Sequence, residues 1–417
     1  MLLSYLKIAW KVLLRRKFFT AISLFGISFT LMILLVVYAL FDYTLGPHAP
    51  ERRADKLLFA SRIEMEYKTE GINRSSMGYA FLVQHVRPLR TPAKVSISES
   101  NWRETVAYLG NQTLKLDQKR TDAEFWQVLD FDFVAGRPYN QREVRDAAHV
   151  AVINEATARR YFGRTLGVVG RTIELDARPY QVVGVVRDVP LLRFSSYADV
   201  WLPVTVTTDD LHSPDYMGSH QAILLGRSPT DVPLMQREYE QMIARLPLPD
   251  PVKFKKITSE PLPLRTAVLT RYMGAPQVPG GDAPFLRRLL LIGLLFMLLP
   301  ALNLVNINVS RTLERSGEIG VRKAFGATAS RLVGQFLVEN IFLTFLGALL
   351  GVALAAGVLH VLNDSQFFPY SNFGLNGRVF GVALAIALLF GLLSGAYPAY
   401  KLSKLPAVQA LKGDLGG

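Results

Sequence analysis

Four long runs of uncharged, mostly apolar residues interrupt a chain whose other segments mix apolar and polar positions. Each run contains 22 to 24 residues. As helices, the runs would each span about 33–36 Å, which exceeds the roughly 30 Å thickness of a hydrocarbon core. Buried helices of a soluble core are the alternative, but they are usually shorter. The pattern therefore predicts four transmembrane helices, over Phe18–Phe41, Leu289–Ser310, Asn340–Asn363 and Val379–Tyr400.

The first run is also a candidate for a cleaved signal peptide. The apolar region of a signal peptide is about 7–15 residues long and ends in a small-residue cleavage site. This run is longer, and the residues that follow it, Tyr43–Pro47, contain no A-x-A pattern. The sequence favours a retained helix.

Residues 43–284 combine short β-branched runs with helical periodicity. Leu57–Ile63 has the composition of a strand, and apolar positions on both sides of Asp176–Pro179 indicate a β-hairpin. Asn154 is a candidate N-cap for the helix that would follow it, and Asp231 begins an amphipathic pattern. The strand–helix–strand order predicts a mixed α/β domain built from small split βαβ units.

Composition changes the picture through charge and through cysteine. The 417 residues carry a formal net charge of +13 and no cysteine. Residues 43–284 hold 31 Lys and Arg against 28 Asp and Glu, and the other segments hold 16 against 6. The basic excess lies beside the apolar runs, which is typical of a membrane protein and argues against nucleic-acid binding. The lack of cysteine excludes disulfides, cysteine-ligated metals and thiol catalysis.

Basic residues in the short flanks predict the orientation. Five precede the first run, five lie between the second and third runs, three follow the fourth, and Arg378 alone separates the third and fourth. Under the positive-inside rule, both termini lie in the cytoplasm of a multi-pass inner-membrane protein. The predicted segments are a cytoplasmic amphipathic helix (1–17), transmembrane helices (18–42, 285–310, 332–363 and 379–400), an extracytoplasmic α/β domain (43–284), a cytoplasmic loop (311–331), a short external loop (364–378) and a cytoplasmic tail (401–417).

Patterns of enzyme chemistry are absent from the sequence. It contains no H-E-x-x-H, no G-x-S-x-G and no glycine-rich run that ends in Gly-Lys-Ser/Thr. His212 and His220 lie near Asp209, Asp210 and Asp215, but a polar loop explains them better than a metal site. We expect no catalytic, cofactor or metal site in this chain.

Small and polar residues occur inside the apolar runs. Gly347-x-x-x-Gly351 and Gly391-x-x-x-Gly395 permit close helix packing, either within one bundle or in a dimer. Asn303, Asn306 and Asn308 need hydrogen-bonding partners in a membrane, which other helices would supply. A substrate site is the alternative.

The cytoplasmic loop between the second and third runs has a helical charge pattern. Glu314 and Glu318, and Glu318 and Arg322, are four residues apart, a spacing that supports a short helix. Ile319 and Phe325 add apolar contacts. The segment has the character of a docking helix, with a charged loop against lipid head groups as the alternative.

This loop and several other segments resemble the FtsX-like permeases, the membrane subunits of MacB- and LolCDE-type ABC transporters. The loop reads R-x-x-E-I-G-V-R-K-A-x-G-A from Arg315 to Ala327. Phe125–Leu129, Val152–Glu155 and Val182–Val186 are similar to segments of the MacB periplasmic core domain, and Tyr397–Leu411 is similar to the family's C-terminal end. The resemblance covers essentially the whole chain.

The resemblance implies a permease that works with other chains. Family members pair with a second permease chain and with cytoplasmic ATPase subunits, and a periplasmic adaptor and an outer-membrane duct are further partners. Because this sequence has no ATPase motif, ATP would be used by a separate subunit rather than by a fused domain as in MacB. The resemblance assigns ATPase coupling to Glu314, Arg315, Glu318, Ile319, Arg322, Lys323, Ala324, Phe325 and Gly326.

Three functions follow from these observations. The leading one is a permease that drives export or extraction of an envelope substrate. The second is FtsX-like transmembrane signalling, in which an external partner is regulated and no substrate moves. The third is a membrane-anchored binding protein whose cytoplasmic loop is inert.

Overall fold

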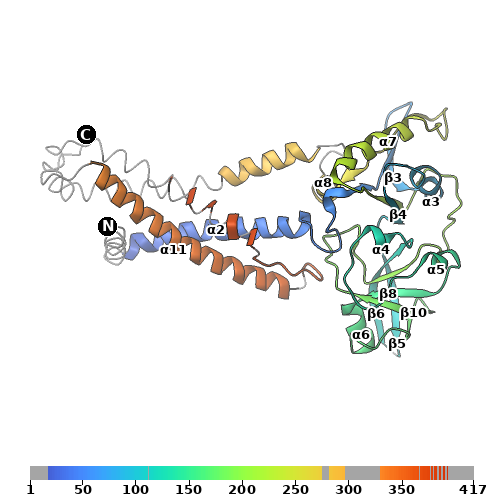
Figure 1. The fold of residues 1–417 in the computed structure, drawn as a ribbon, viewed down its shortest axis with the longest axis horizontal. Coiled ribbons are helices and arrows are strands. Elements are labelled where there is room, and N and C mark those ends of the chain that lie inside the picture. Colours follow the sequence, from blue (N-terminus) through green and yellow to red (C-terminus); the bar gives the residue numbers. More distant parts are fainter. Residues whose placement is uncertain are drawn as a thin grey trace. The chain divides into compact units, whose positions relative to one another are not determined.

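The computed structural model describes residues 17–110, 112–274, 281–295, 329–365 and 367–375, together with a few residues between 377 and 392. These residues form two units, whose elements are labelled in Figure 1. The helical unit contains the described residues of 1–42, 286–367 and 373–417. The globular unit contains residues 43–285 and 368–372.

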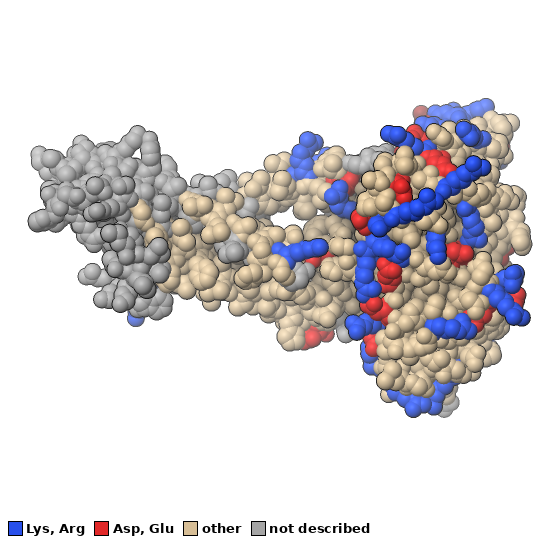
Figure 2. Space-filling view, viewed as in Figure 1, with Lys and Arg blue, Asp and Glu red and all other residues tan. Residues whose placement is uncertain are grey.

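Two described helices are long and apolar enough to cross a bilayer. They lie within α2 (Lys17–Leu45) and α11 (Ala329–Asp364), over Thr20–Leu45 and Asn340–Asp364. On the face shown in Figure 2, charged side chains gather over the globular unit, and few lie over the described part of the helical unit. The other two predicted spans lie mostly outside the described residues, so the count of four stays a prediction.

The helices α2 and α11 pack through the glycines of Gly347-x-x-x-Gly351. A Cβ atom on Gly347 would lie 2.6 Å from Cγ2 of Ile27, and one on Gly351 would lie 3.0 Å from Cβ of Leu31. Ile27 and Leu31 are each 1% exposed. This glycine pair therefore joins two helices of one chain, which is one of the two uses that the sequence allows. Gly391 and Gly395 lie outside the described residues.

We expect Gly347→Val to weaken this helix pair. The new side chain would meet the branched carbon of Ile27 rather than a flexible tip, and such overpacking costs about 1–3 kcal/mol. The measurement is thermal unfolding of the full chain in detergent. The matched control is Gly357→Val in the same helix, where a Cβ atom meets no described atom within 4 Å. Equal melting temperatures for the two variants would show that the contact is unimportant.

The globular unit is built on a 15-stranded sheet. Its strands follow the order β11-β8-β10-β9-β5-β6-β4-β13-β3-β2-β14. Four strands lie off this path: β1 pairs with β13 and β15, β7 with β10, and β12 with β3. The strands are β1 (Leu57–Ala60), β2 (Ile63–Tyr67), β3 (Ile72–Met77), β4 (Lys94–Glu99), β5 (Arg103–Leu109), β6 (Gln112–Thr121), β7 (Phe133–Gly136), β8 (Val150–Asn154), β9 (Thr172–Leu175), β10 (Arg178–Val186), β11 (Val200–Pro203), β12 (Met217–Gly218), β13 (His220–Leu225), β14 (Phe254–Thr258) and β15 (Leu262–Pro263).

Helices pack against this sheet on several sides (Figure 1). Between β8 and its parallel neighbour β10 the chain forms α6 and then β9. Because β8 and β10 pair directly, this is a βαβ unit without a strand between the two, rather than the split form that the sequence predicts. β11 also pairs with β6, so this end of the sheet closes on itself. The helices are α3 (Tyr79–Phe81), which continues into the π-turn Leu82–Val86, α4 (Phe125–Val128), α5 (Gln141–Arg145), α6 (Glu155–Phe162), α7 (Val232–Ala244) and α8 (Leu264–Met273), with short 3₁₀ turns at Ala54–Lys56 and Pro229–Asp231.

Strand β13 lies between two hydrophobic cores. It pairs with β1 on one side, with Leu57 opposite Leu225, and with β4 on the other, with His220 opposite Glu99. Because side chains alternate across a strand, Ile223 and Leu225 enter one core while Ala222 and Leu224 enter a second. All six residues of β13 are therefore buried.

Several elements that the sequence predicts are present in the structure. β9 and β10 form the expected hairpin, with Asp176 and Ala177 at positive φ in its turn. The Asn154 side chain caps α6 by accepting a hydrogen bond from the Thr157 N–H at 2.8 Å. The strand expected over Leu57–Ile63 is wrong as a single element, because β1 ends at Ala60 and β2 begins at Ile63.

Candidate functional site

The nine residues of the predicted coupling helix, from Glu314 to Gly326, lie outside the described residues. Their role stays a prediction. The candidate site that the structure does describe lies in the globular unit. There, three segments close in sequence to the apolar runs are held by buried carboxylates.

The first of these carboxylates is Glu51, which follows α2 in the sequence. Glu51 is 0% exposed and forms an ion pair with Arg193, which is 3% exposed. Arg193 also donates hydrogen bonds to the backbone oxygens of Tyr43 (2.8 Å) and Gly46 (3.1 Å). Ser196 donates a further hydrogen bond to the Glu51 carboxylate. The chain that leaves α2 is thus fastened to residues 191–199, here called the anchor loop.

A buried lysine supports the anchor loop from β6. Lys119 Nζ donates hydrogen bonds to the backbone oxygens of Phe194 (2.7 Å) and Ser195 (3.0 Å). Burial lowers the pKa of Lys119 to about 7, and the nearby charge of Glu99 opposes this shift. The neutral amine still has two N–H groups for its two acceptors, so this contact does not depend on the charge.

The second carboxylate is Asp199, at the end of the anchor loop. It accepts hydrogen bonds from Asn154 Nδ2 (3.1 Å), the Asp117 N–H (2.9 Å) and the Tyr370 hydroxyl (2.6 Å). Burial, followed by the charge of Asp199, raises the pKa of Tyr370, so this hydroxyl remains a donor. The backbone oxygen of Pro369 also accepts from the Leu191 N–H at 3.3 Å. The segment 368–372, which follows α11 in the sequence, is thereby fastened to the anchor loop.

The third carboxylate is Asp282, which is 1% exposed at the start of the helical residues 282–295. Its two oxygens accept hydrogen bonds from two neighbouring residues of α8, Arg265 Nε at 2.5 Å and Thr266 Oγ1 at 3.0 Å. The residues that lead into the second apolar run therefore begin at a fixed point on α8.

Glu51, Asp199 and Asp282 together form what we call the anchor carboxylates. Removing one partner of a buried ion pair leaves an uncompensated charge and typically costs about 3–5 kcal/mol. Of the three, only Glu51 belongs to a fully buried ion pair. Asp199 accepts from neutral donors, and the Arg265 side chain opposite Asp282 is 59% exposed, so these two contacts are weaker. The sequence did not identify the anchor carboxylates, because Glu51 and Arg193 lie 142 positions apart. The available signal was Arg193 itself, a lone charge among Leu191, Leu192 and Phe194.

The histidines considered as metal ligands have other surroundings. His220 is buried, and its ring lies 5.4 Å from that of Tyr79. Burial lowers the pKa of His220 to about 4, so the ring is neutral at physiological pH. Asp209 forms an ion pair with Arg103 at 2.6 Å, and Asp210 accepts from the His212 N–H. Among the described residues, no three metal-binding side chains cluster.

Comparison with protein families decides the class of this chain. The MacB-like periplasmic core domain matches residues 20–242, more than half of the sequence, and the C-terminal domain of FtsX-like permeases matches residues 290–407. The chain belongs to the MacB/FtsX-like family of ABC transporter permeases. The resemblance seen in the sequence is thereby confirmed. The MacB/FtsX-like permeases are inner-membrane proteins.

The relatives of this permease include the macrolide export ATP-binding/permease proteins MacB of two bacteria. The protein from Salmonella typhi is 26% identical over 303 residues, which cover 72% of this chain and 44% of the relative. The protein from Burkholderia cenocepacia is 26% identical over 341 residues, which cover 78% and 46%. The chain spans less than half of the length of these relatives.

Among solved structures, the periplasmic region of MacB from Actinobacillus actinomycetemcomitans is similar to this permease. It is 12% identical with a TM-score of 0.35, and the match covers 49% of this chain and 87% of that one.

Proposed function

We propose that this chain is the membrane subunit of an ABC transporter that passes conformational changes of a separate ATPase to an extracytoplasmic domain. The movement drives export or extraction of an envelope substrate. The observation that carries the proposal is the order of the two family domains, with the R-x-x-E-I-G-V-R-K-A-x-G-A segment inside the second. The chain itself binds no ATP in this mechanism.

The anchor carboxylates support mechanical transmission. A conformational change reaches a second site only where both sites bias the same structural element. Here the globular unit holds the residues after α2, the residues after α11 and the residues at 282 through buried polar contacts. Movement of the corresponding membrane segments would therefore be transmitted to the globular unit, because the connecting residues are held in place.

The proposal requires four spans with both termini in the cytoplasm. Two apolar helices of sufficient length among the described residues and the positive flanks support this topology. The hydrogen bond between Tyr370 and Asp199 supports an extracytoplasmic location for residues 364–378, because it fastens that loop to the globular unit.

Single-cysteine variants test this topology, since the chain has no native cysteine. A membrane-impermeant thiol reagent, applied to intact cells with a permeabilised outer envelope, is expected to label Thr69→Cys and Ser365→Cys, which are exposed positions. Ser316→Cys and Ser403→Cys should be labelled only after the inner membrane is opened. Labelling of Ser316→Cys in intact cells would place the loop outside and reject the proposal.

Association with an ATPase tests the function directly. The permease, solubilised from its native membrane, is expected to retain an ABC ATPase subunit, and ATP turnover by that subunit should change when the permease is removed. A permease that purifies without an ATPase and leaves ATP turnover unchanged would favour a membrane-anchored binding protein.

A further inference from the structure

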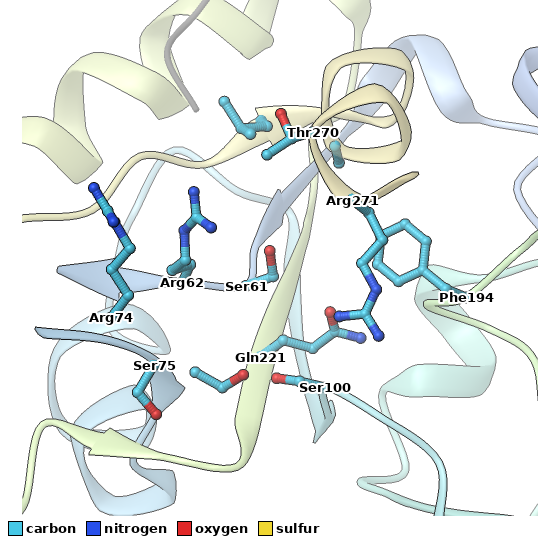
Figure 3. Close-up of a pocket in the computed structure, with 12 residues that line it drawn as sticks. Ser61, Arg62, Arg74, Ser75, Ser100, Phe194, Gln221, Thr270 and Arg271 are labelled. Carbon is cyan, nitrogen blue, oxygen red and sulfur yellow. The ribbon is translucent and has the colours of Figure 1, made fainter. Parts of the chain in front are cut away.

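A cavity of about 430 Å³ opens in the globular unit between α8, the connection from β1 to β2, and the strands β3 and β13. Figure 3 shows Arg271 reaching from α8 toward Gln221 and Ser100, with Arg62 and Arg74 on the opposite side. The volume of the cavity lies within the range of about 300–1,000 Å³ that is usual for small-molecule sites. Apart from Phe194, whose backbone oxygen accepts from Lys119, none of the residues that line the cavity takes part in the anchor contacts.

The charge of the cavity is positive. Three guanidinium groups line it, and no carboxylate is among the described residues that line it. Arg62 and Arg74 share one partner, Glu64, at 3.4 and 3.0 Å. Arg271 has no carboxylate within 4 Å among the described residues; it donates to Asn101 and lies 5.3 Å over the ring of Phe194. The site therefore has more positive than negative charge. It suits an oxyanion, because a guanidinium group can bind one with two parallel hydrogen bonds, in bidentate geometry.

The cavity wall also contains buried polar atoms without a partner. Ser100 is 4% exposed and Gln221 is 0% exposed, yet Ser100 Oγ and Gln221 Oε1 have no hydrogen bond among the described residues. Thr270 Oγ1, on α8, is also buried and has no hydrogen bond among the described residues. An unsatisfied buried polar atom costs about 1–3 kcal/mol. A ligand with an N–H or O–H group could satisfy Gln221, whose Nε2 already faces Ser98.

We propose that this cavity binds a small organic anion that carries a hydrogen-bond donor and an apolar group. The anion would lie among Arg62, Arg74 and Arg271, and the donor would reach Gln221 Oε1. The apolar group would contact the wall formed by Phe194, Leu262 and Ala267. This inference goes beyond the proposed function, because it gives the globular unit a ligand whether or not an ATPase is coupled to the chain.

The probe for this site is N-acetyl-L-phenylalanine, which has a carboxylate, an amide N–H and an aromatic ring. Its neutral amide, N-acetyl-L-phenylalaninamide, differs in the charge, and inorganic phosphate has the charge alone. Binding to the full chain in lipid nanodiscs is measured by saturation-transfer NMR titration, with empty nanodiscs as background and no ATPase present. We expect the acid to bind at least about tenfold more tightly than the amide or phosphate, which corresponds to one charge-assisted hydrogen bond.

Variants assign the binding to the cavity. Arg74→Gln and Arg271→Gln should each raise the Kd of the acid about fivefold or more, and both side chains are exposed enough for the fold to tolerate the change. The matched control is Arg142→Gln, whose side chain is 82% exposed on α5 and does not line the cavity. The proposal would be overturned if the acid does not bind, or if the amide or phosphate binds as tightly as the acid. It would also be overturned if neither arginine variant changes the Kd of the acid.

Discussion

A permease that carries Glu318→Lys is expected to reach the membrane at the normal level and to lose at least about tenfold in affinity for its ATPase. The substitution leaves every apolar run unchanged, so insertion should be unaffected. It reverses a charge in the segment that we propose couples the permease to its ATPase. Loss of the intrahelical pairing with Arg322 accounts for only about 0.2–0.5 kcal/mol. A tenfold change corresponds to about 1.4 kcal/mol, so a loss of this size requires an intermolecular contact.

The measurement is the amount of ATPase recovered with the detergent-solubilised permease, together with ATP turnover of the complex. Phe325→Ala should act in the same direction, because it removes an apolar contact. Lys412→Glu, a charge reversal in the tail, is the matched control and should have a smaller effect. Full association and turnover in both loop variants would show that residues 314–326 do not couple the two subunits.

The second large effect is expected from Arg193→Met, which should lower the free energy of unfolding of the globular unit by about 3–5 kcal/mol. Methionine fills much of the arginine's volume but leaves Glu51 buried without its counter-charge. It also leaves the backbone oxygens of Tyr43 and Gly46 without their donor. Denaturant unfolding of the full chain in detergent, followed by tryptophan fluorescence, measures the change.

The neighbouring ion pair of Arg52 and Asp132 provides the control. It is well formed at 2.7 Å, but its side chains are 47% and 35% exposed. Exposed pairs contribute about 0–1 kcal/mol, so Arg52→Met should change stability little. The double variant Glu51→Leu with Arg193→Met should be more stable than Arg193→Met alone, because no buried charge remains. If Arg193→Met is as stable as Arg52→Met, the buried ion pair contributes no more to stability than the exposed one.

The parts of the fold that the sequence predicts are those with local signals. The Asn154 cap and the hairpin of β9 and β10 are specified by residues within a few positions of one another. Strands β3 and β4 gave no such signal. β3 carries four polar residues in six, and β4 buries Ser96 and Ser98, which the alternation of a strand does not lead one to expect. Ser96 is satisfied by Asp122, 26 positions away, a partner that only the folded chain supplies.

The candidate site residues also differ in whether their signal in the sequence is local. The proposed coupling segment has a contiguous motif that a sequence can display, but its residues lie outside the described part of the chain, so its role stays a prediction. The anchor carboxylates could not be recognised, because each depends on partners that the fold brings together from distant positions. Asp199 and Tyr370 are 171 positions apart. A carboxylate in such a pair has no sequence pattern of its own; burial and the partner define its role.

Strand β13 has a consequence for how the globular unit responds to stress. Its alternate side chains belong to two different hydrophobic cores, so loss of either core exposes one face of the same strand to water. The two cores that share β13 are therefore expected to unfold together, as one cooperative unit.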